Sequence, residues 1–182
     1  MDLFLKKNPR YEGRFTFVQA GEPSRTHVEQ YKKLNDEIDE LVEDINWRRR
    51  RSRWKPILHI KEHFNPFALS ALQRLATFCI VSSLHDGMNL VAKEFVSSRV
   101  DGDGVLILSR FAGAARELTD ALLVNPYSVD DIAKAIKVAI NMSKKERRRR
   151  MSSLRAIVQE NNIYSWASGI ISEIAKLQFP ED

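Results

Sequence analysis

Five short runs of apolar residues alternate with longer stretches of helical periodicity, and this alternation constrains the fold more than any other feature of the chain. The runs are apolar almost throughout, without the polar residue at every second position that marks a strand with one solvent-facing side. Strands of this kind are buried on both faces, and strands that alternate with helices form parallel sheets. The sequence therefore predicts an α/β fold, a parallel sheet with helices on both faces. The expected strands are residues 14–21, 56–60, 78–82, 104–109 and 121–126.

The expected helices are marked by apolar residues three and four positions apart and by capping residues at their starts. Thr26 and Glu29 have the spacing of a capping box before the first long helix. Asn65 followed by Pro66, and Ser128, are typical starts of two further helices. A helix is also expected from about residue 89, a short one after the fourth strand, and two more over residues 144–160 and 163–177. The apolar face of the first helix carries Val28, Tyr31, Leu34, Ile38, Leu41, Val42 and Ile45.

Length and composition indicate an ordinary folded domain. The chain has 182 residues, of which 43% are hydrophobic and 29% charged, enough for one domain with one sizeable core. The single cysteine, Cys79, lies in an apolar run, which excludes a disulfide framework and suits a reducing compartment. The sequence has no apolar run of about 18 residues and no signal-peptide pattern. We therefore expect a cytoplasmic protein that does not contact a membrane.

Two basic clusters, residues 48–55 and 144–150, hold much of the positive charge behind the net charge of +5. Such clusters can bind nucleic acid or another polyanion. They can equally be solvated helix faces or helix ends, where Arg and Lys complement the helix dipole. The second interpretation is favoured, because neither cluster is accompanied by an aromatic-rich strand or by helix-turn-helix spacing.

The stretch from Ser82 to Glu94, SSLHDGMNLVAKE, joins the third expected strand to a helix. Ligands of parallel α/β sheets bind beyond the carboxyl ends of the strands, which is where this turn lies. Gly87 allows close backbone approach, the first-turn N–H groups of the helix favour an anion, and the carboxylates of Asp86 and Glu94 can accept from sugar hydroxyls. Leu90, Val91 and Phe95 are expected to pack the helix onto the sheet. Residues alone thus indicate a site for a phosphate-bearing, hydroxyl-rich ligand, with an ordinary capped turn as the alternative.

A second loop, residues 109–127, contains Gly113 between alanines. Its composition allows backbone and helix to approach closely, and tight packing is a better explanation than a role in ligand binding. Neither loop matches the phosphate-binding loop that ends in Gly-Lys-Ser/Thr or the G-x-G-x-x-G fingerprint.

Four motifs together resemble the trehalose-6-phosphate synthase family: DGMNLVAKEFV, GVLILSRFAGAARELTDALLVNPY, EPSRTHVEQY, and INW followed by W-x-P. The related glucosylglycerol-phosphate synthases share much of this pattern. The resemblance extends from about Phe15 to the C-terminus. It implies that residues 1–182 form a single Rossmann-like nucleotide-sugar-binding domain, the C-terminal domain of a two-domain (GT-B type) glycosyltransferase. Helices from about residue 144 to residue 178 would close that domain, and the N-terminal acceptor domain would be absent.

The resemblance also implies roles for individual residues. Asp86 would contact the hydroxyls of the donor glucose and is the residue assigned to catalysis. Arg25 would bind the phosphate of the acceptor, as a guanidinium fork can. His63 and Phe64 would hold the uracil ring. The sugar, diphosphate and ribose of the donor would be held by Gly87, Met88, Asn89, Leu90, Val91, Ala92, Lys93 and Glu94.

The implied reaction is the transfer of glucose from UDP-glucose, or a similar nucleotide sugar, to glucose 6-phosphate with retained anomeric configuration, giving trehalose 6-phosphate. No cofactor and no metal are expected. The family's cationic pair for the diphosphate, in an R-x-D-Y-x-K-G segment, is not in this sequence, and His85 replaces a frequent Arg. We therefore expect the chain by itself to be inactive and to need an N-terminal domain or a partner chain that carries one.

Other interpretations stay open from the sequence. The acceptor could be that of a glucosylglycerol-phosphate synthase, or the chain could be a non-catalytic scaffold or regulatory module. A homo-oligomer is compatible with the sequence, and nucleic acid is not an expected partner.

Overall fold

A computed structural model describes residues 1–22, 28–50 and 53–176. The chain divides into two compact units, Met1–Leu69 and Ser70–Asp182. Parallel strands lie in both units, a pair in the first and a three-stranded sheet in the second. All five strands fall within the predicted ranges. The single domain expected from the sequence stays a prediction.

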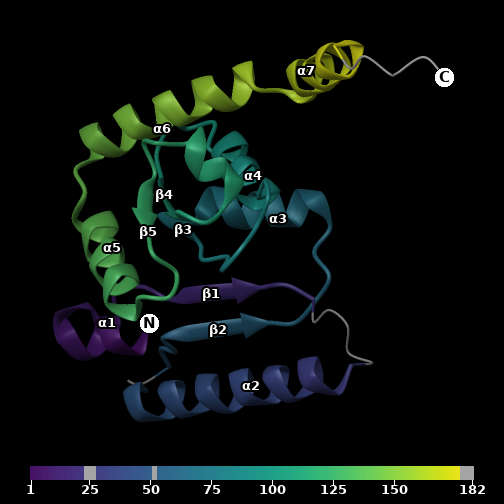
Figure 1. Ribbon diagram of the computed structural model, residues 1–182. Coiled ribbons are helices and arrows are strands. Elements are labelled where there is room, and N and C mark those ends of the chain that lie inside the picture. The colour runs from purple at the N-terminus through teal and green to yellow at the C-terminus, as the bar shows by residue number, and fades with distance from the viewer. Residues whose placement is uncertain (23–27, 51–52, 177–182) are drawn as a thin grey trace. The chain divides into compact units, whose positions relative to one another are not determined.

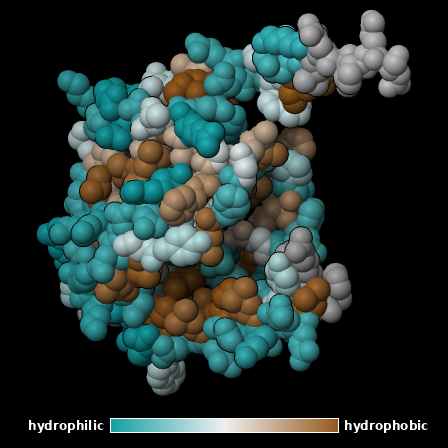
Figure 2. All heavy atoms as spheres, in the orientation of Figure 1, coloured by the Kyte–Doolittle hydropathy of each residue, from teal (hydrophilic) through white to brown (hydrophobic). Residues whose placement is uncertain are grey.

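The first unit is built around the parallel pair β1 (Phe17–Ala20) and β2 (Ile57–Ile60). The long helix α2 (Glu29–Arg49) is tied to β2 by Asn46, whose side chain donates to the Ile57 carbonyl (2.9 Å) and accepts from the Ile57 N–H (3.0 Å). The short helices α1 (Asp2–Lys7) and η1 (Pro9–Tyr11) add an aromatic cluster in which the rings of Phe4 and Tyr11 lie 5.4 Å apart. Figure 2 shows hydrophobic atoms at the surface over β2 and α2, where Leu34, Leu41 and Leu58 are exposed.

The predicted capping box of α2 is wrong. The helix begins at Glu29 with Val28 as its N-cap residue, and that residue makes no side-chain capping bond. Glu29 is therefore the first helical residue, whereas a capping box needs the acid at the third helical position. Thr26, the other half of the prediction, lies outside the described residues.

The second unit has the sheet order β3-β4-β5, with all strands parallel. The strands are β3 (Phe78–Val81), β4 (Val105–Ser109) and β5 (Leu122–Val124). The central strand β4 is buried along its whole length, as the unbroken apolar run predicts. Figure 1 shows α5 (Val129–Asn141) on one side of this sheet and α4 (Leu90–Ser98) on the other. Phe95 and Val96 of α4 pack with Leu106, Leu108, Met151 and Leu154 in the main hydrophobic cluster.

Several helix starts follow the predicted capping residues. Asn65 accepts from the Ala68 N–H (2.9 Å) at the start of α3 (Pro66–Leu75), which spans the boundary between the units. Ser128 caps α5 in the same way, accepting from the Asp131 N–H at 3.2 Å. Asn162, which was not among the predicted capping residues, separates α6 (Lys144–Glu160) from α7 (Ile163–Ala175) and caps the latter. These helices end and begin where local side-chain chemistry predicts.

The last helix, α7, contains no buried residue, although much of it is apolar. Trp166 is 53% exposed and Tyr164 is 82% exposed. Figure 2 shows hydrophobic atoms at this helix as well. No helix within the described residues has both the length and the apolar character needed to cross a membrane.

Part of each basic cluster is engaged in ion pairs inside the chain. In the first cluster Arg49 pairs with Asp2 (2.6 Å) and Glu12 (2.9 Å), which ties α1 to the end of α2. In the second cluster Arg147 pairs with Asp103, 2.5 Å between Nε and Oδ1. On the same helix, Arg149 and Arg150 share Glu146, at 2.9 and 2.8 Å. These pairs support the interpretation of both clusters as helix faces and helix ends instead of a nucleic-acid surface.

Candidate functional site

The turn from β3 to α4 is shaped by Asn89, the N-cap residue of α4. Asn89 has φ +72°, and no other residue in the described ranges except glycine has a positive φ. Asparagine tolerates this left-handed conformation better than most residues because its short polar side chain can bond locally. Its Oδ1 accepts from the Ala92 N–H at 2.9 Å. Asn89 therefore turns the chain through its backbone and starts α4 through its side chain.

Asp86, the residue assigned to catalysis, is held in place by this turn. Its Oδ2 accepts from Asn89 Nδ2 (2.8 Å), and its Oδ1 accepts from the Met88 N–H (3.1 Å). The bond from Asn89, followed by that from Met88, lowers the pKa of Asp86 from its ordinary value. The carboxylate is thus ionised near neutral pH. An ionised carboxylate has about four acceptor positions, so it can still accept from a ligand hydroxyl.

Most of the other turn residues face solvent. Gly87, Met88, Leu90, Val91 and Glu94 are exposed, which leaves this surface open to a ligand. The N–H groups of the first turn of α4 have no partner within the helix, and they carry the positive end of its dipole. Within the described part of the chain, the Glu94 carboxylate makes no hydrogen bond or ion pair.

The prediction that Leu90 and Val91 pack the helix onto the sheet is wrong. They are 60% and 49% exposed. The buried face consists of Ala92, Phe95 and Val96, which are spaced three and four residues apart. In a helix whose buried face carries Ala92, Phe95 and Val96, Leu90 lies on the opposite side and Val91 lies at the edge of that face.

Lys93, also assigned to the donor, is already paired. Its Nζ lies 3.0 Å from Oε2 of Glu117, and Asn161 Nδ2 donates to the same oxygen at 3.1 Å. The Lys93 side chain is 19% exposed. The Glu117 carboxylate therefore links Lys93 of α4 to the turn between α6 and α7, a connection that the sequence did not indicate.

The loop that follows β4, which contains Gly113, binds the backbone of the turn. The Gly113 N–H donates to the Asp86 carbonyl (2.8 Å), and the Ala114 N–H donates to the Met88 carbonyl (2.7 Å). Asp86 also forms an isolated parallel bridge with Ala112. A Cβ on Gly113 would lie 2.0 Å from the carbonyl oxygen of Gly87. Gly113 is therefore needed for close packing, as the sequence favoured, and the structure that it packs against is the candidate site itself.

The remaining predicted site residues, His63, Phe64 and Arg25, do not belong to the second unit. His63 and Phe64 belong to the first unit. The His63 side chain is 79% exposed, and its Nδ1 lies 3.2 Å from Oε2 of Glu22. Phe64 is half-buried. Arg25 lies outside the described residues.

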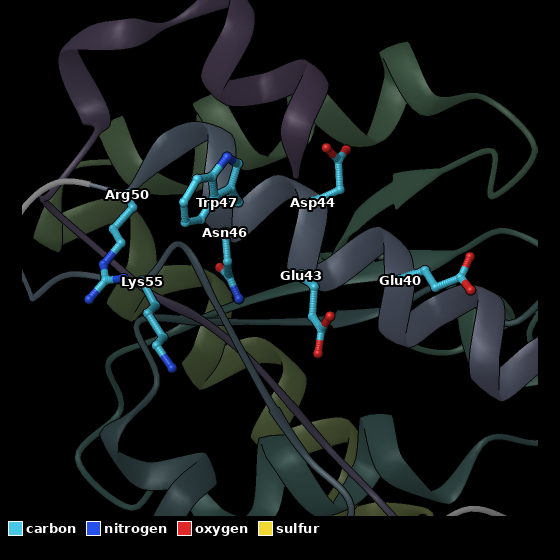
Figure 3. Close-up of a pocket in the computed structure, with 7 residues that line it drawn as sticks. All are labelled: Glu40, Glu43, Asp44, Asn46, Trp47, Arg50 and Lys55. Atoms are coloured by element: carbon cyan, nitrogen blue, oxygen red, sulfur yellow. The ribbon is translucent and has the colours of Figure 1, made fainter.

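The first unit also has a surface hollow, lined by Glu40, Glu43, Asp44, Asn46, Trp47, Arg50 and Lys55. Figure 3 shows that Glu43 and Asp44 point to opposite sides of α2. Asp44 is held by Arg48 at 2.7 Å, and Asn46 by β2. The lining side chains therefore do not converge on a common point. Among the described residues, no three His, Cys, Asp or Glu side chains are grouped as a metal site requires.

The model of glycosyltransferase family 20 matches residues 1–176. The chain belongs to glycosyltransferase family 20. This assignment confirms the resemblance that the four motifs indicated.

Relatives within family 20 match nearly all of this chain. The trehalose-6-phosphate synthase of Enterobacter sp. (strain 638) is 38% identical over 176 residues, which are 96% of this chain and 37% of the relative. The bifunctional trehalose-6-phosphate synthase/phosphatase of Thermoproteus tenax is 39% identical over 170 residues, 93% of this chain and 23% of the relative. The chain thus spans well under half the length of these relatives.

Solved structures of similar proteins have the same fold. One is "Trehalose-6-phosphate from E. coli bound with UDP-2-fluoro glucose", with a TM-score of 0.93 and 35% sequence identity. The superposed region is 97% of this chain and 40% of the E. coli chain. Another, an α,α-trehalose-phosphate synthase (UDP-forming) from Burkholderia xenovorans in complex with glucose-6-phosphate, has a TM-score of 0.92 at 35% identity and covers 96% of this chain and 39% of that chain. These similarities confirm the predicted fold class, parallel sheets with helices as in a GT-B glycosyltransferase.

Proposed function

We propose that this chain is the donor-binding part of a retaining glycosyltransferase that moves glucose from UDP-glucose to glucose 6-phosphate and so forms trehalose 6-phosphate. The observation that carries the proposal is the turn at residues 86–94. It combines an ionised, fixed Asp86 with the open start of α4. Membership of family 20 and the described ligands of the E. coli and Burkholderia structures support this choice of substrates.

The turn can act on a nucleotide sugar in two ways. Asp86 accepts from glucose hydroxyls, which orients the sugar above the turn. The first-turn N–H groups of α4 that are not bonded to Asn89 bind the diphosphate, and they stabilise the negative charge that it gains as the glycosidic bond breaks. Glu94, exposed one turn into the helix, is available for ribose hydroxyls. These roles need no metal or cofactor, and we expect none.

The proposed acceptor and uracil contacts extend beyond this turn. Arg25 is assigned to the acceptor phosphate, and His63 and Phe64 to the uracil ring. The rest of the enzyme would come from a further domain or a partner chain. We therefore expect the 182-residue chain to show no turnover by itself.

The test is a chimaera in which this chain replaces the matching stretch of the Enterobacter relative. Release of UDP from UDP-glucose is expected to require glucose 6-phosphate. Asp86→Asn is expected to lower kcat/KM on the order of a hundredfold, because an amide is a weaker acceptor than a carboxylate. Glu160→Gln, an exposed change at the end of α6, is the matched control and should leave the rate unchanged.

Two outcomes would change the proposal. A folded chimaera with no UDP binding by calorimetry would favour a scaffold. Full activity in Asp86→Asn would refute the role of this turn.

A further inference from the structure

The Asn89 side chain uses all its hydrogen-bonding groups inside the turn. Its Nδ2 donates to Asp86 Oδ2 (2.8 Å) and Ser83 Oγ (3.2 Å), while its Oδ1 accepts from the Ala92 N–H (2.9 Å). The residue is only 7% exposed. Its side chain therefore connects the end of β3, the Asp86 carboxylate and the first turn of α4, and it has little surface left for a ligand.

The backbone of Asn89 adopts a conformation that favours glycine. At φ +72° a glycine would provide the turn with less conformational strain. A glycine would nevertheless lose the three side-chain bonds. The backbone conformation of the turn therefore does not by itself require asparagine, whose side chain adds the bonds to Asp86, Ser83 and Ala92.

Hydrogen bonds restrain both the backbone and the carboxylate of Asp86. Its backbone is bound by the second loop through Gly113, and its carboxylate by the Met88 N–H and by Asn89. Among the donors to this carboxylate, only Asn89 Nδ2 belongs to a side chain. That contact is therefore the one that a substitution can remove without altering the backbone donor.

We propose that Asn89 is a positioning residue, whose side chain fixes the orientation of the Asp86 carboxylate while it starts the anion-facing helix. The inference rests on the proposed function, because positioning matters only if Asp86 meets the donor. One residue would thus set the geometry of both the sugar contact and the diphosphate contact.

Two substitutions separate the two tasks of the side chain. Asn89→Asp keeps an oxygen for the Ala92 N–H but places a second carboxylate against Asp86, and like charges at this distance raise a carboxyl pKa. Asn89→Gly keeps the positive φ and loses every side-chain bond, and it costs a helix start only a few tenths of a kcal/mol. Both variants are expected to fold, which circular dichroism and thermal melting would verify.

The primary measurement is the pKa of the Asp86 carboxyl, determined by NMR titration in the full 182-residue chain. This measurement needs neither turnover nor a partner. The pKa is expected to rise in Asn89→Gly and to rise further in Asn89→Asp. Asn162 is the matched control, since it caps α7 through Oδ1 but holds no carboxylate. The Asn162→Gly and Asn162→Asp variants should leave the Asp86 pKa unchanged.

The second measurement uses the chimaera. Both Asn89 variants are expected to lose on the order of ten- to a hundredfold in kcat/KM for UDP-glucose, the range for a lost hydrogen bond to a charged group. The loss in Asn89→Asp is expected to recover partly at low pH, where one of the paired carboxyls is protonated.

The two proposals can fail separately. An Asp86 pKa that stays unchanged in Asn89→Gly overturns the positioning role whatever the activity. Equal kcat/KM in an active wild-type chimaera and in both Asn89 variants overturns it as well. An inactive wild-type chimaera with the expected pKa changes would count against the proposed function, because the titration shows Asn89 controlling Asp86 without any turnover.

Discussion

Replacing Gly113 with alanine is expected to push the second loop away from the candidate site. A Cβ at this position would lie 2.0 Å from the Gly87 carbonyl oxygen, 2.7 Å from the Gly87 carbonyl carbon and 3.2 Å from the Met88 Cα. All three are backbone atoms, so no side chain can rotate to relieve the clash. An ordinary contact distance of 3.4 Å requires the loops to separate by 1.4 Å along the shortest of these contacts.

Such a separation would break the bonds between the loops. The Gly113 N–H to Asp86 carbonyl distance is 2.8 Å and the Ala114 N–H to Met88 carbonyl distance is 2.7 Å, so neither bond survives a displacement of that size. Each lost backbone bond costs about 1 kcal/mol, and more where a buried group stays unpaired. The expected loss is therefore about 2–4 kcal/mol in the free energy of unfolding.

Urea unfolding of the full chain measures this loss. Gly169→Ala is the matched control, because it adds the same methyl group inside α7, where no atom lies within 4 Å. Alanine in a helix interior is expected to be neutral or stabilising by up to about 1 kcal/mol. A Gly113→Ala variant whose free energy of unfolding lies within about 0.5 kcal/mol of wild type would refute the steric reasoning, because changes of that size are typical of ordinary surface positions.

Three further predictions concern stability and reactivity. Arg99 is buried, and its Nη1 donates to the carbonyls of Gln73 and Ala76 at 3.1 and 2.7 Å. Arg99→Met is therefore expected to lower the free energy of unfolding by about 2–4 kcal/mol, measured by urea titration. An unchanged urea midpoint would refute this prediction. The bonds from Arg149 and Arg150 lower the pKa of Glu146 from 4.5 to about 2, so this stabilisation is complete above pH 4.5 and is lost as the pH falls toward 2. The melting temperature should fall over that window, and less steeply in Glu146→Gln. Burial raises the pKa of the Cys79 thiol to about 12, so a thiol reagent at pH 8 should label the folded chain much more slowly than the unfolded chain, and equal labelling rates would contradict this.

Local chemistry explains why much of the fold could be predicted from the sequence. Asn65, Ser128 and Asn162 each cap the helix that follows, because an N-cap bond involves residues only two or three positions apart. The buried strand β4 follows from its unbroken apolar run. Periodicity was less reliable at the start of α4, where Leu90 proved exposed because it lies on the side of the helix opposite Ala92, Phe95 and Val96.

The turn from β3 to α4 could be predicted from the sequence, but its internal contacts could not. Asp86 and the helix start are adjacent in sequence, so the turn between them could be recognised. The Gly113 contact with Gly87 joins residues far apart in sequence and depends on the register of β3 and β4. The pairing of Arg147 with Asp103, 44 residues apart, has the same origin. Spacing along the chain carries no information about such partners.

The charges around the turn explain why the chain by itself is expected to bind the donor weakly. The start of α4 offers roughly half a positive charge, and its effect is confined to the first turn. Lys93 is neutralised by Glu117 at 3.0 Å, and Arg110, which follows β4, lies 3.7 Å from Asp131. A diphosphate carries more negative charge than this surface can balance. We therefore expect Lys93→Met to change UDP affinity little in the chimaera, whereas Glu117→Gln, which frees the ammonium group, should raise the affinity. A large loss of affinity in Lys93→Met would instead show that Lys93 leaves Glu117 to bind the diphosphate directly.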